Sequence, residues 1–452
     1  MYFAGTLYWV THVMVLYGGL QRWVAVLVNA LLVAYLALFP ALFAVLMRRL
    51  LLAFGARALM AAPWVWVATE LGRTHLFGGF PWVLLGYSQA TLLPVAQLAS
   101  VFGVYGVSAL VASVSAAAAL LVATPSRRDR LTAAGLVTLV VLCAVVWGSQ
   151  RAATAAWTRE GRSLRVGLIQ GNVDQAEKWN AARASTIFGD YLRMTRDAIG
   201  SGAELVLWPE SSTPFLFEED RAGAESIREL ARQTRVAILL GSDQIEWRVD
   251  HNRRVPDKTY NSAFMVRADG ATAGVYRKMH LVPFGEYVPL KRLLTFAEPL
   301  VEAVGSGFAA GEEATLLPAG DHRISVAICY EIVYPALIRQ FVLGGSELLT
   351  TITNDAWFGR TSAPYQHFAQ ASMRAIEEGR YLVRSANTGI SGIVDPYGRV
   401  LAATDIFQPA VTVGSVKLLT ASTFYARVGD VFAYASVLVT LVLLVGARRR
   451  VQ

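Results

Sequence analysis

The run Arg323-Ile-Ser-Val-Ala-Ile-Cys329-Tyr330-Glu331 is an apolar stretch that ends abruptly in a thiol followed by a carboxylate. Its β-branched and apolar residues predict a short strand with Cys329 at its end. The other cysteine of the chain, Cys143, lies in an apolar segment that is predicted to span a membrane and offers no plausible disulfide partner. Cys329 is therefore either a small buried hydrophobic residue or a nucleophile, and its surroundings in the sequence must decide between the two.

Strands and helices alternate around this run, from about residue 160 to about residue 425. Alternation of this kind predicts a layered α/β fold in which helices cover the sheet faces, and enzyme sites in such folds gather where strands end. We expect strands at 164–169, 204–208, 236–241, 262–267, 325–328 and 348–353, and helices near 180–200, 222–234, 334–343 and 364–379.

Hydrophobic residues make up 54% of the 452-residue chain, and they crowd into roughly the first 150 and the last 25 positions. A bilayer core requires about 20 mostly apolar residues in a helix. The chain is therefore predicted to be a membrane protein with a transmembrane domain at 1–155, a large non-membrane domain at 160–425, and a last helix with a basic tail at 426–452. Candidate spans are 2–20, 23–47, 51–70, 93–123, 131–149 and 429–447, and residues 71–90 are expected to form a re-entrant or interfacial loop.

Basic residues border the expected spans and give an orientation. Arg48-Arg49, Arg127-Arg128-Asp129-Arg130 and Arg448-Arg449-Arg450 all fit the cytoplasmic side, where such residues are favoured, while Arg22 falls on the outer side. The large domain is then predicted to lie outside the cytoplasm. The formal net charge of +8 mainly reflects this topology and gives little reason to expect nucleic acid as a partner.

Three of the expected strand ends carry groups that suit catalysis. The first is Trp208-Pro209-Glu210, the second is Lys278 followed by a Pro- and Gly-rich loop with Glu286, and the third is Cys329. A loop carboxylate or a surface lysine is common, so each motif alone is weak. The order Glu, Lys, Cys at strand ends of one domain is much more specific.

This order resembles the nitrilase superfamily, whose Glu-Lys-Cys triad sits on an αββα sandwich. More closely, the chain resembles the membrane-embedded branch of that superfamily, the apolipoprotein N-acyltransferases. The family has two more spans before its catalytic domain than the five expected here, so two N-terminal helices are expected to be missing. The resemblance covers essentially the whole chain and rests on the flanking spans together with Gln170-Gly171-Asn172, Trp208-Pro209-Glu210, Lys278–Pro289, Cys329-Tyr330-Glu331 and Asn354–Phe358.

The resemblance implies transfer of a fatty acyl chain from a phospholipid to the N-terminal amine of the diacylglyceryl-cysteine of apolipoproteins. Cys329 would carry the chain as a thioester in a ping-pong cycle, and Glu210 would be its general base. Lys278 and a backbone N–H near Tyr330 would stabilise the oxyanion. The resemblance further implies a monomer in a bacterial inner membrane, with a periplasmic catalytic domain that requires neither cofactor nor metal.

Supporting residues are expected around this triad. The resemblance places Glu286 and Glu331 in the active site, where they orient Lys278 and tune the thiol, or else serve only as rim carboxylates. Asn261 and Asn354 are either hydrogen-bonding supports or ordinary turn residues.

Aromatic side chains on the expected loops suit a membrane interface. Candidates for lipid binding are Trp179, Trp357, Phe358, Tyr287 and Tyr330, on loops that would act as a lid opening toward the membrane. Core packing is the competing explanation, chiefly for Trp357.

Two other functions remain open from the sequence. A membrane-anchored amidase or nitrilase-type hydrolase would use the same triad and hand the acyl group to water. A transporter or scaffold with an inert domain would make the Glu-Lys-Cys order a coincidence, although the few polar residues within the spans disfavour transport. The six histidines are scattered, so the sequence offers no metal-ligand spacing.

Overall fold

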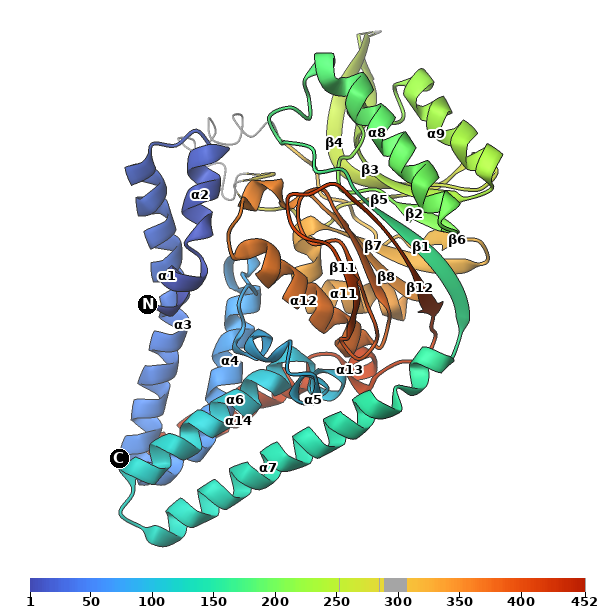
Figure 1. The fold of residues 1–452 in the computed structure, drawn as a ribbon. Coiled ribbons are helices and arrows are strands. Elements are labelled where there is room, and N and C mark those ends of the chain that lie inside the picture. The colour runs from blue at the N-terminus through green and yellow to red at the C-terminus, as the bar shows by residue number, and fades with distance from the viewer. Residues whose placement is uncertain (252, 284, 288–306, 452) are drawn as a thin grey trace.

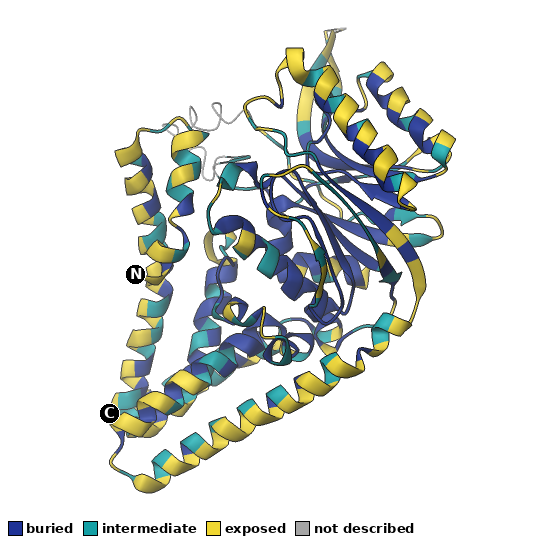
Figure 2. Cartoon of the chain, in the orientation of Figure 1, coloured by how far each residue is buried: buried dark blue, intermediate teal, exposed yellow. Residues whose placement is uncertain are grey.

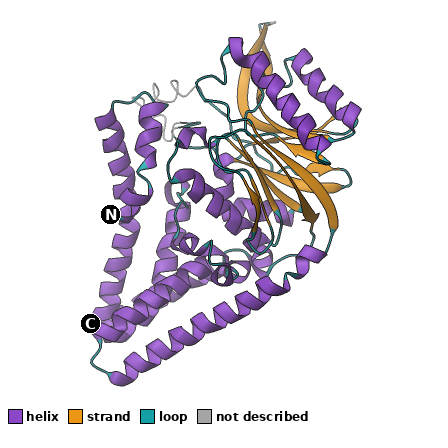
Figure 3. Cartoon of the chain, viewed as in Figure 1, coloured by secondary structure: helices purple, strands orange, loops and turns teal. Residues whose placement is uncertain are grey.

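The computed structural model describes residues 1–251, 253–283, 285–287 and 307–451. Long helices extend from one side of a compact body that contains the strands (Figure 1 and Figure 3). The strands are largely buried, whereas the long helices are exposed along much of their length (Figure 2). Apolar helices that lack a protein partner on much of their surface suit a lipid environment.

The body contains two six-stranded sheets. Parallel pairs, β1–β2–β3 in one sheet and β7–β8–β9 in the other, form the centre of each sheet, and the flanking pairs are antiparallel. The first sheet has the order β12 (Ala410–Leu418), β1 (Arg162–Gln170), β2 (Leu205–Leu207), β3 (Ala237–Asp250), β4 (Arg253–Val266) and β5 (Thr272–Arg277). The second has the order β11 (Val400–Ala403), β10 (Gly392–Val394), β9 (Leu382–Ala386), β8 (Leu348–Thr353), β7 (His322–Ile328) and β6 (Leu317–Ala319).

The two sheets pack face to face and helices cover their outer faces (Figure 1). Alternate residues of β1 divide between two layers: Leu168 joins the core between the sheets, and Ile169 joins the core beneath α8 (Ala181–Gly200) and α9 (Arg221–Thr234). On the second sheet, α11 (Pro335–Leu343) and α12 (Ala363–Glu378) take the same place. The predicted αββα sandwich is therefore confirmed.

The sequence located the central strands well and the peripheral ones poorly. β3 continues to Asp250 and β4 begins at Arg253, because the two strands pair as one long antiparallel hairpin beyond the apolar residues that predicted them. β6 and the strands from β9 to β12 were not predicted, and β5 was expected only as an apolar run before Lys278, without bounds. Several of these are only three to five residues long, too short to show a clear alternation of side chains.

The helical part includes α3 (Arg22–Phe54), α4 (Ala62–His75), α6 (Ala99–Ala123), α7 (Arg127–Thr154) and α14 (Val431–Val451). Within the described residues, four helical segments are long and apolar enough to cross a membrane. These segments are Arg22–Gly78, Ala99–Ala123, Arg127–Arg159 and Val431–Arg450. They support a membrane-embedded protein.

Three expected spans are wrong as single helices, and one of them, 93–123, is divided into α5 (Leu93–Ala96) and α6 by Gln97 and Leu98. Residues 2–20 form two short helices, α1 (Tyr2–Thr6) and α2 (Trp9–Leu16), whose buried side chains pack against the sandwich instead of facing outward. Residues 51–70 are interrupted by the turn Gly55–Ala61, where Gly55 adopts a φ of +65° and Pro63 starts the next helix.

Candidate active site

The three predicted catalytic residues follow three different strands and meet at one place. Glu210 follows β2 and Lys278 follows β5 in the first sheet, and Cys329 follows β7 in the second. Lys278 Nζ lies 3.5 Å from Glu210 Oε1. The charges of both side chains act on the Cys329 thiol, since Glu210 raises its pKa and Lys278 lowers it. The packing of the two sheets therefore brings the three groups together.

Cys329 occupies a strained turn at the end of β7. It has a φ of +53°, in the left-handed region that a non-glycine residue rarely adopts, and it begins a short 3₁₀ turn. Only 8% of the residue is exposed. Burial raises the pKa of the thiol well above its ordinary value, and the nearby Glu210 acts in the same direction. At neutral pH the sulfur is therefore a thiol that needs a base before it can attack.

Lys278 is a buried cation between two carboxylates. Its Nζ lies 2.8 Å from Glu286 Oε1 in addition to its contact with Glu210. Burial alone would lower the pKa of Lys278, but the two carboxylates outweigh burial and raise it above the ordinary lysine value. The site therefore holds a fixed ammonium group beside the sulfur.

The Glu210 carboxylate is oriented by two donors. Asn261 Nδ2 donates to Oε1 at 2.7 Å, and the backbone N–H of Asn354 donates to Oε2 at 2.8 Å. Lys178, which the sequence did not single out, donates from Nζ to the backbone carbonyl of Glu210 at 3.4 Å. Both predicted asparagines thus contact the Glu210 carboxylate, Asn261 through its side chain and Asn354 through its backbone.

Glu286 is part of the same network. Asn261 Nδ2 also donates to Glu286 Oε1 at 3.2 Å, and the backbone N–H of Val282 donates to Glu286 Oε2 at 2.7 Å. These bonds hold Glu286 against Lys278. This arrangement favours an orienting role over that of a rim carboxylate.

Glu331 ties the lysine loop to the turn that carries the nucleophile. Its Oε1 accepts from Tyr276 Oη at 2.7 Å and from the backbone N–H groups of Met279 and His280 at 2.7 and 3.0 Å. Its Oε2 accepts from the backbone N–H of Ile328 at 2.7 Å. Burial raises the pKa of Glu331 to about 7, although these bonds favour the ionised form. Its contacts are those of a structural anchor, not of a group that touches the sulfur.

Three predicted lipid-binding aromatics pack against the N-terminal part of the chain. Tyr330 is buried and stacks on Trp82, with ring centroids 6.1 Å apart. Phe358 also packs edge-on to Trp82, at 5.9 Å, and Trp357 packs edge-on to Tyr17 at 4.9 Å. These contacts are those expected for core packing, and lipid binding by these side chains stays a prediction.

Trp179 and Tyr287 are placed differently. Trp179 is 51% exposed beside Lys178, whose Nζ lies 6.0 Å from its ring centroid. Tyr287 is partly buried, and burial raises its pKa. Phe284, Val288 and Pro289 of the predicted lysine loop lie outside the described residues.

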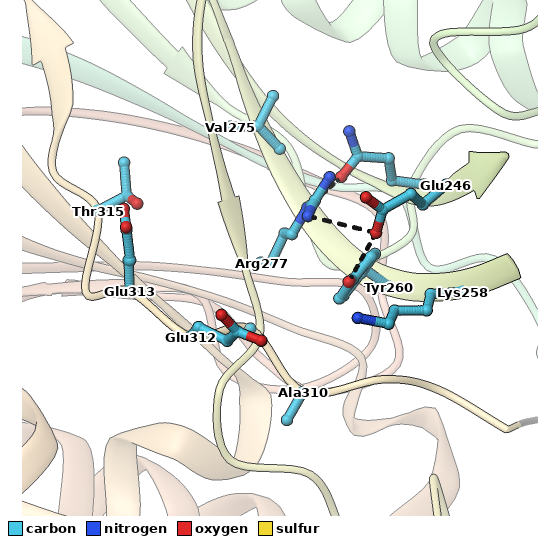
Figure 4. Close-up of a pocket in the computed structure, with 11 residues that line it drawn as sticks. Glu246, Lys258, Tyr260, Val275, Arg277, Ala310, Glu312, Glu313 and Thr315 are labelled. Carbon is cyan, nitrogen blue, oxygen red and sulfur yellow. Dashed lines mark hydrogen bonds and ion pairs between the residues drawn. The ribbon is translucent and has the colours of Figure 1, made fainter. Parts of the chain in front are cut away.

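A separate cleft of about 540 Å³ is lined in part by Val275 and Arg277 of β5, the strand that precedes Lys278 (Figure 4). It is lined by polar groups such as Glu246, Lys258 and Arg277, and Glu246 pairs with Arg277 and with Tyr260 there. None of the described residues that line it belongs to the predicted catalytic set. Its paired charges suit neither an acyl chain nor the triad chemistry.

Sequence reasoning missed several buried groups next to the site. Asp355, His367 and Arg384 form a fully buried cluster that contacts the backbone of Cys329. His367 counted only as one of the scattered histidines, because nothing local distinguishes a helix histidine that faces a core. Lys178 lies in a polar run and gave no separate signal.

Two family models match the chain. The model described as apolipoprotein N-acyltransferase N-terminal domain matches residues 1–117, and the model described as carbon-nitrogen hydrolase matches residues 165–424. The second match covers more than half of the chain. Together the two matches span both the helical part and the sandwich.

Full-length relatives agree with these matches. The chain is 41% identical to the apolipoprotein N-acyltransferase of Geobacter metallireducens, over 96% of this chain and 82% of the relative. It is 38% identical to that of Methylococcus capsulatus, over 93% and 81%, and 33% identical to that of Shewanella oneidensis, over 99% and 85%.

The alternative function, an amidase, is supported only by a distant structural similarity to a solved amidase. A solved mutant amidase of the nitrilase superfamily from Nesterenkonia AN1 aligns with a TM-score of 0.46 at 19% identity, over 61% of this chain and 97% of the amidase. That level carries no weight against relatives that cover nearly the whole chain. By these family models and relatives, the chain belongs to the apolipoprotein N-acyltransferase family.

Proposed function

We propose that this enzyme moves a fatty acyl chain from a phospholipid to the N-terminal amine of a diacylglyceryl-cysteine on a lipoprotein, through a thioester on Cys329. The observation that carries the proposal is the meeting of Glu210 and Lys278 at the buried Cys329, in a chain of this family. Glu286, Glu331, Asn261 and Asn354 hold these groups in place.

In the first half-reaction, Glu210 takes the thiol proton as the Cys329 sulfur attacks the phospholipid ester carbonyl. The negative charge that develops on the carbonyl oxygen is stabilised by Lys278 Nζ and the backbone N–H of Tyr330. The tetrahedral intermediate collapses by breaking the ester C–O bond. The lysophospholipid alkoxide leaves with the proton held by Glu210, and the acyl chain remains on sulfur.

In the second half-reaction, the lipoprotein amine attacks the thioester carbonyl, and Glu210 accepts a proton from the attacking nitrogen. The same two donors stabilise the second oxyanion. Collapse breaks the C–S bond, forms the amide and returns the proton from Glu210 to the sulfur. A ping-pong cycle follows, because one site serves both substrates in turn.

We place lipid handling on the aromatic loops around the site. Trp179 is exposed and suits the membrane interface, and Tyr287 lies partly buried on the lysine loop. Phe358 and Trp357 would leave their contacts with Trp9 and Tyr17 when a lipid enters. Movement of these loops would admit the two lipid substrates in sequence.

We further propose that the catalytic domain, residues 160–425, faces the periplasm from the bacterial inner membrane, and that the enzyme acts as a monomer. Residues 1–155 form the membrane domain, and 426–452 form the last span with its tail. The basic groups at Arg127–Arg130 and Arg448–Arg450 support cytoplasmic ends for the helices that lead into and out of the domain.

Acyl transfer can be followed with a labelled phospholipid and a diacylated lipopeptide. Label should remain on the protein as a thioester until the lipopeptide is added, and should then move to the peptide as an amide. Cys329→Ser should abolish the labelled adduct. Cys143→Ser is the matched control and should leave it unchanged, because Cys143 lies on α7, far along the chain from the strand ends. Release of the label as free fatty acid before the lipopeptide is added would contradict the proposal and identify a hydrolase.

A further inference from the structure

The backbone carbonyl of the nucleophile is bound by a histidine from α12. His367 Nε2 lies 3.1 Å from the carbonyl oxygen of Cys329, and the imidazole is fully buried. A carbonyl oxygen can only accept, so Nε2 must carry the hydrogen. This bond fixes both the tautomer of His367 and the position of the carbonyl.

The imidazole is itself held by buried charges. Arg384 Nη2 lies 3.0 Å from His367 Nδ1 and 2.8 Å from Asp355 Oδ2. Asp355 Oδ1 accepts from Thr353 Oγ1 at 2.9 Å. It lies 3.1 Å from His367 Nδ1, and because both atoms are acceptors, Asp355 holds the ring through Arg384 and not by a hydrogen bond of its own. Burial and the adjacent Arg384 lower the pKa of His367, which keeps the ring neutral with Nδ1 as an acceptor. The ring cannot turn without unpairing groups that have no access to water.

Aromatic rings complete the support. The centroids of the Trp82 and Phe358 rings lie 5.4 and 6.0 Å from that of His367. Trp82 comes from the N-terminal part of the chain, whereas Phe358 follows β8. The imidazole is therefore clamped by packing as well as by hydrogen bonds.

The carbonyl that His367 binds shares a rigid peptide plane with the N–H of Tyr330. In a trans peptide the C=O and the N–H point in opposite directions, so fixing one aims the other. Rotation of this plane would change ψ of Cys329 and φ of Tyr330, so it would swing the Tyr330 N–H away while leaving the φ of +53° at Cys329 as it is. The hydrogen bond from His367 Nε2 to the carbonyl oxygen of Cys329 opposes that rotation.

We propose that His367 is a positioning residue that sets the peptide plane between Cys329 and Tyr330, and so aims the Tyr330 N–H at the developing oxyanion. This inference rests on the proposed acyl transfer at Cys329. His367 touches neither substrate nor sulfur in this role. It acts through the backbone, as the last link of the chain Thr353–Asp355–Arg384–His367.

The test compares His367→Gln with His367→Asn, both in the Cys143→Ser background. The longer Gln side chain can place its amide N–H where Nε2 donates, whereas Asn is one methylene too short. Two rates are measured in each variant: acylation of Cys329 by labelled phospholipid, and alkylation of Cys329 by iodoacetamide. Alkylation is a displacement at a saturated carbon and develops no oxyanion, so it reports the thiol without the oxyanion donor.

Cys329 of H367N should be acylated on the order of 10- to 100-fold more slowly than that of the parent. A misdirected oxyanion donor lowers the rate by at most as much as the removal of that donor would. The alkylation rate of H367N should change by less than about threefold, and H367Q should acylate within about tenfold of the parent. Equal losses of both rates, an unaffected H367N, or an H367Q as slow as H367N would each overturn the role.

If H367N fails to fold, as judged by its thermal melt, H367Q decides alone. Acylation within about tenfold of the parent then supports the inference, and a greater loss overturns it. A parent enzyme that forms no thioester with phospholipid would instead refute the proposed function, which keeps the two failures distinct.

Discussion

Replacing Glu331 by Gln tests whether one carboxylate holds the lysine loop to the nucleophile turn. Three donors, from Tyr276, Met279 and His280, share Oε1, and the N–H of Ile328 meets Oε2. The least costly Gln rotamer keeps its oxygen toward the three donors and turns its NH2 toward Ile328. One buried N–H then loses its acceptor, at about 1–3 kcal/mol, and three bonds lose the strength that a charged acceptor gives, so the total is about 2–4 kcal/mol.

The loss should appear as local opening of the lysine loop. Because every 1.4 kcal/mol is tenfold in an equilibrium constant, the amides of Met279 and His280 should lose protection against hydrogen exchange by roughly 30- to 700-fold. The measurement is made at pH 8, above the pKa of about 7 to which burial raises Glu331, so that the native residue is charged. Amides of β8 serve as an internal reference.

Tyr276→Phe is the matched control for this experiment. It removes one donor and leaves the carboxylate with three, so the loss should be about 1 kcal/mol, or roughly fivefold in protection. Unchanged protection at Met279 and His280 in the Gln variant would refute the reasoning. So would an equal loss of protection in β8, because it would mean that the whole domain, not the loop, depends on Glu331.

Three other outcomes are expected. Lys278→Met should slow thioester formation by roughly 100- to 1000-fold, because the oxyanion loses one donor, and a loss below about tenfold in a folded variant would exclude that role. Alkylation of Cys329 by iodoacetamide should rise about tenfold per pH unit from pH 7 to 9. Burial raises the pKa of the thiol, so little thiolate is present at neutral pH, and its fraction grows about tenfold with each pH unit. A flat profile would mean that the thiolate is already formed. Trp179→Ala should weaken the use of phospholipid more than it changes alkylation of Cys329, and equal losses would count against a lipid-gating role.

The sequence singles out the three candidate catalytic residues because each of them follows an apolar run. Glu210 follows Pro209, Lys278 precedes a Pro- and Gly-rich loop, and Cys329 follows Ile328, so local signals mark all three strand ends. His367 carries no such mark, since its partner is a backbone carbonyl 38 positions away in the chain. Such a contact depends on how the helix sits on its sheet, which side-chain periodicity does not specify.

Apolar composition also misled the prediction of the first span. Hydropathy cannot separate a segment that faces lipid from one that packs against protein, and Trp9 does the latter. Its ring lies 5.0 Å from that of Phe358 and 5.2 Å from that of Trp82. The short helices α1 and α2 therefore cover the sandwich near the nucleophile turn.

The packing of α1 and α2 over the nucleophile turn offers a reason why an acyl group on Cys329 would be transferred to an amine and not hydrolysed by water. Gln366 Oε1 accepts from the indole N–H groups of Trp9 and Trp82 at 3.2 and 2.8 Å, and its Nε2 donates to the carbonyl of Thr6 at 3.0 Å. Trp82 in turn stacks on Tyr330, next to the nucleophile. A thioester on Cys329 would be shielded by these side chains of the N-terminal segment, which would then form one wall of the proposed active site. We infer that the balance between acyl transfer and hydrolysis depends on this wall as much as on the triad, because the triad chemistry alone does not discriminate between an amine and water.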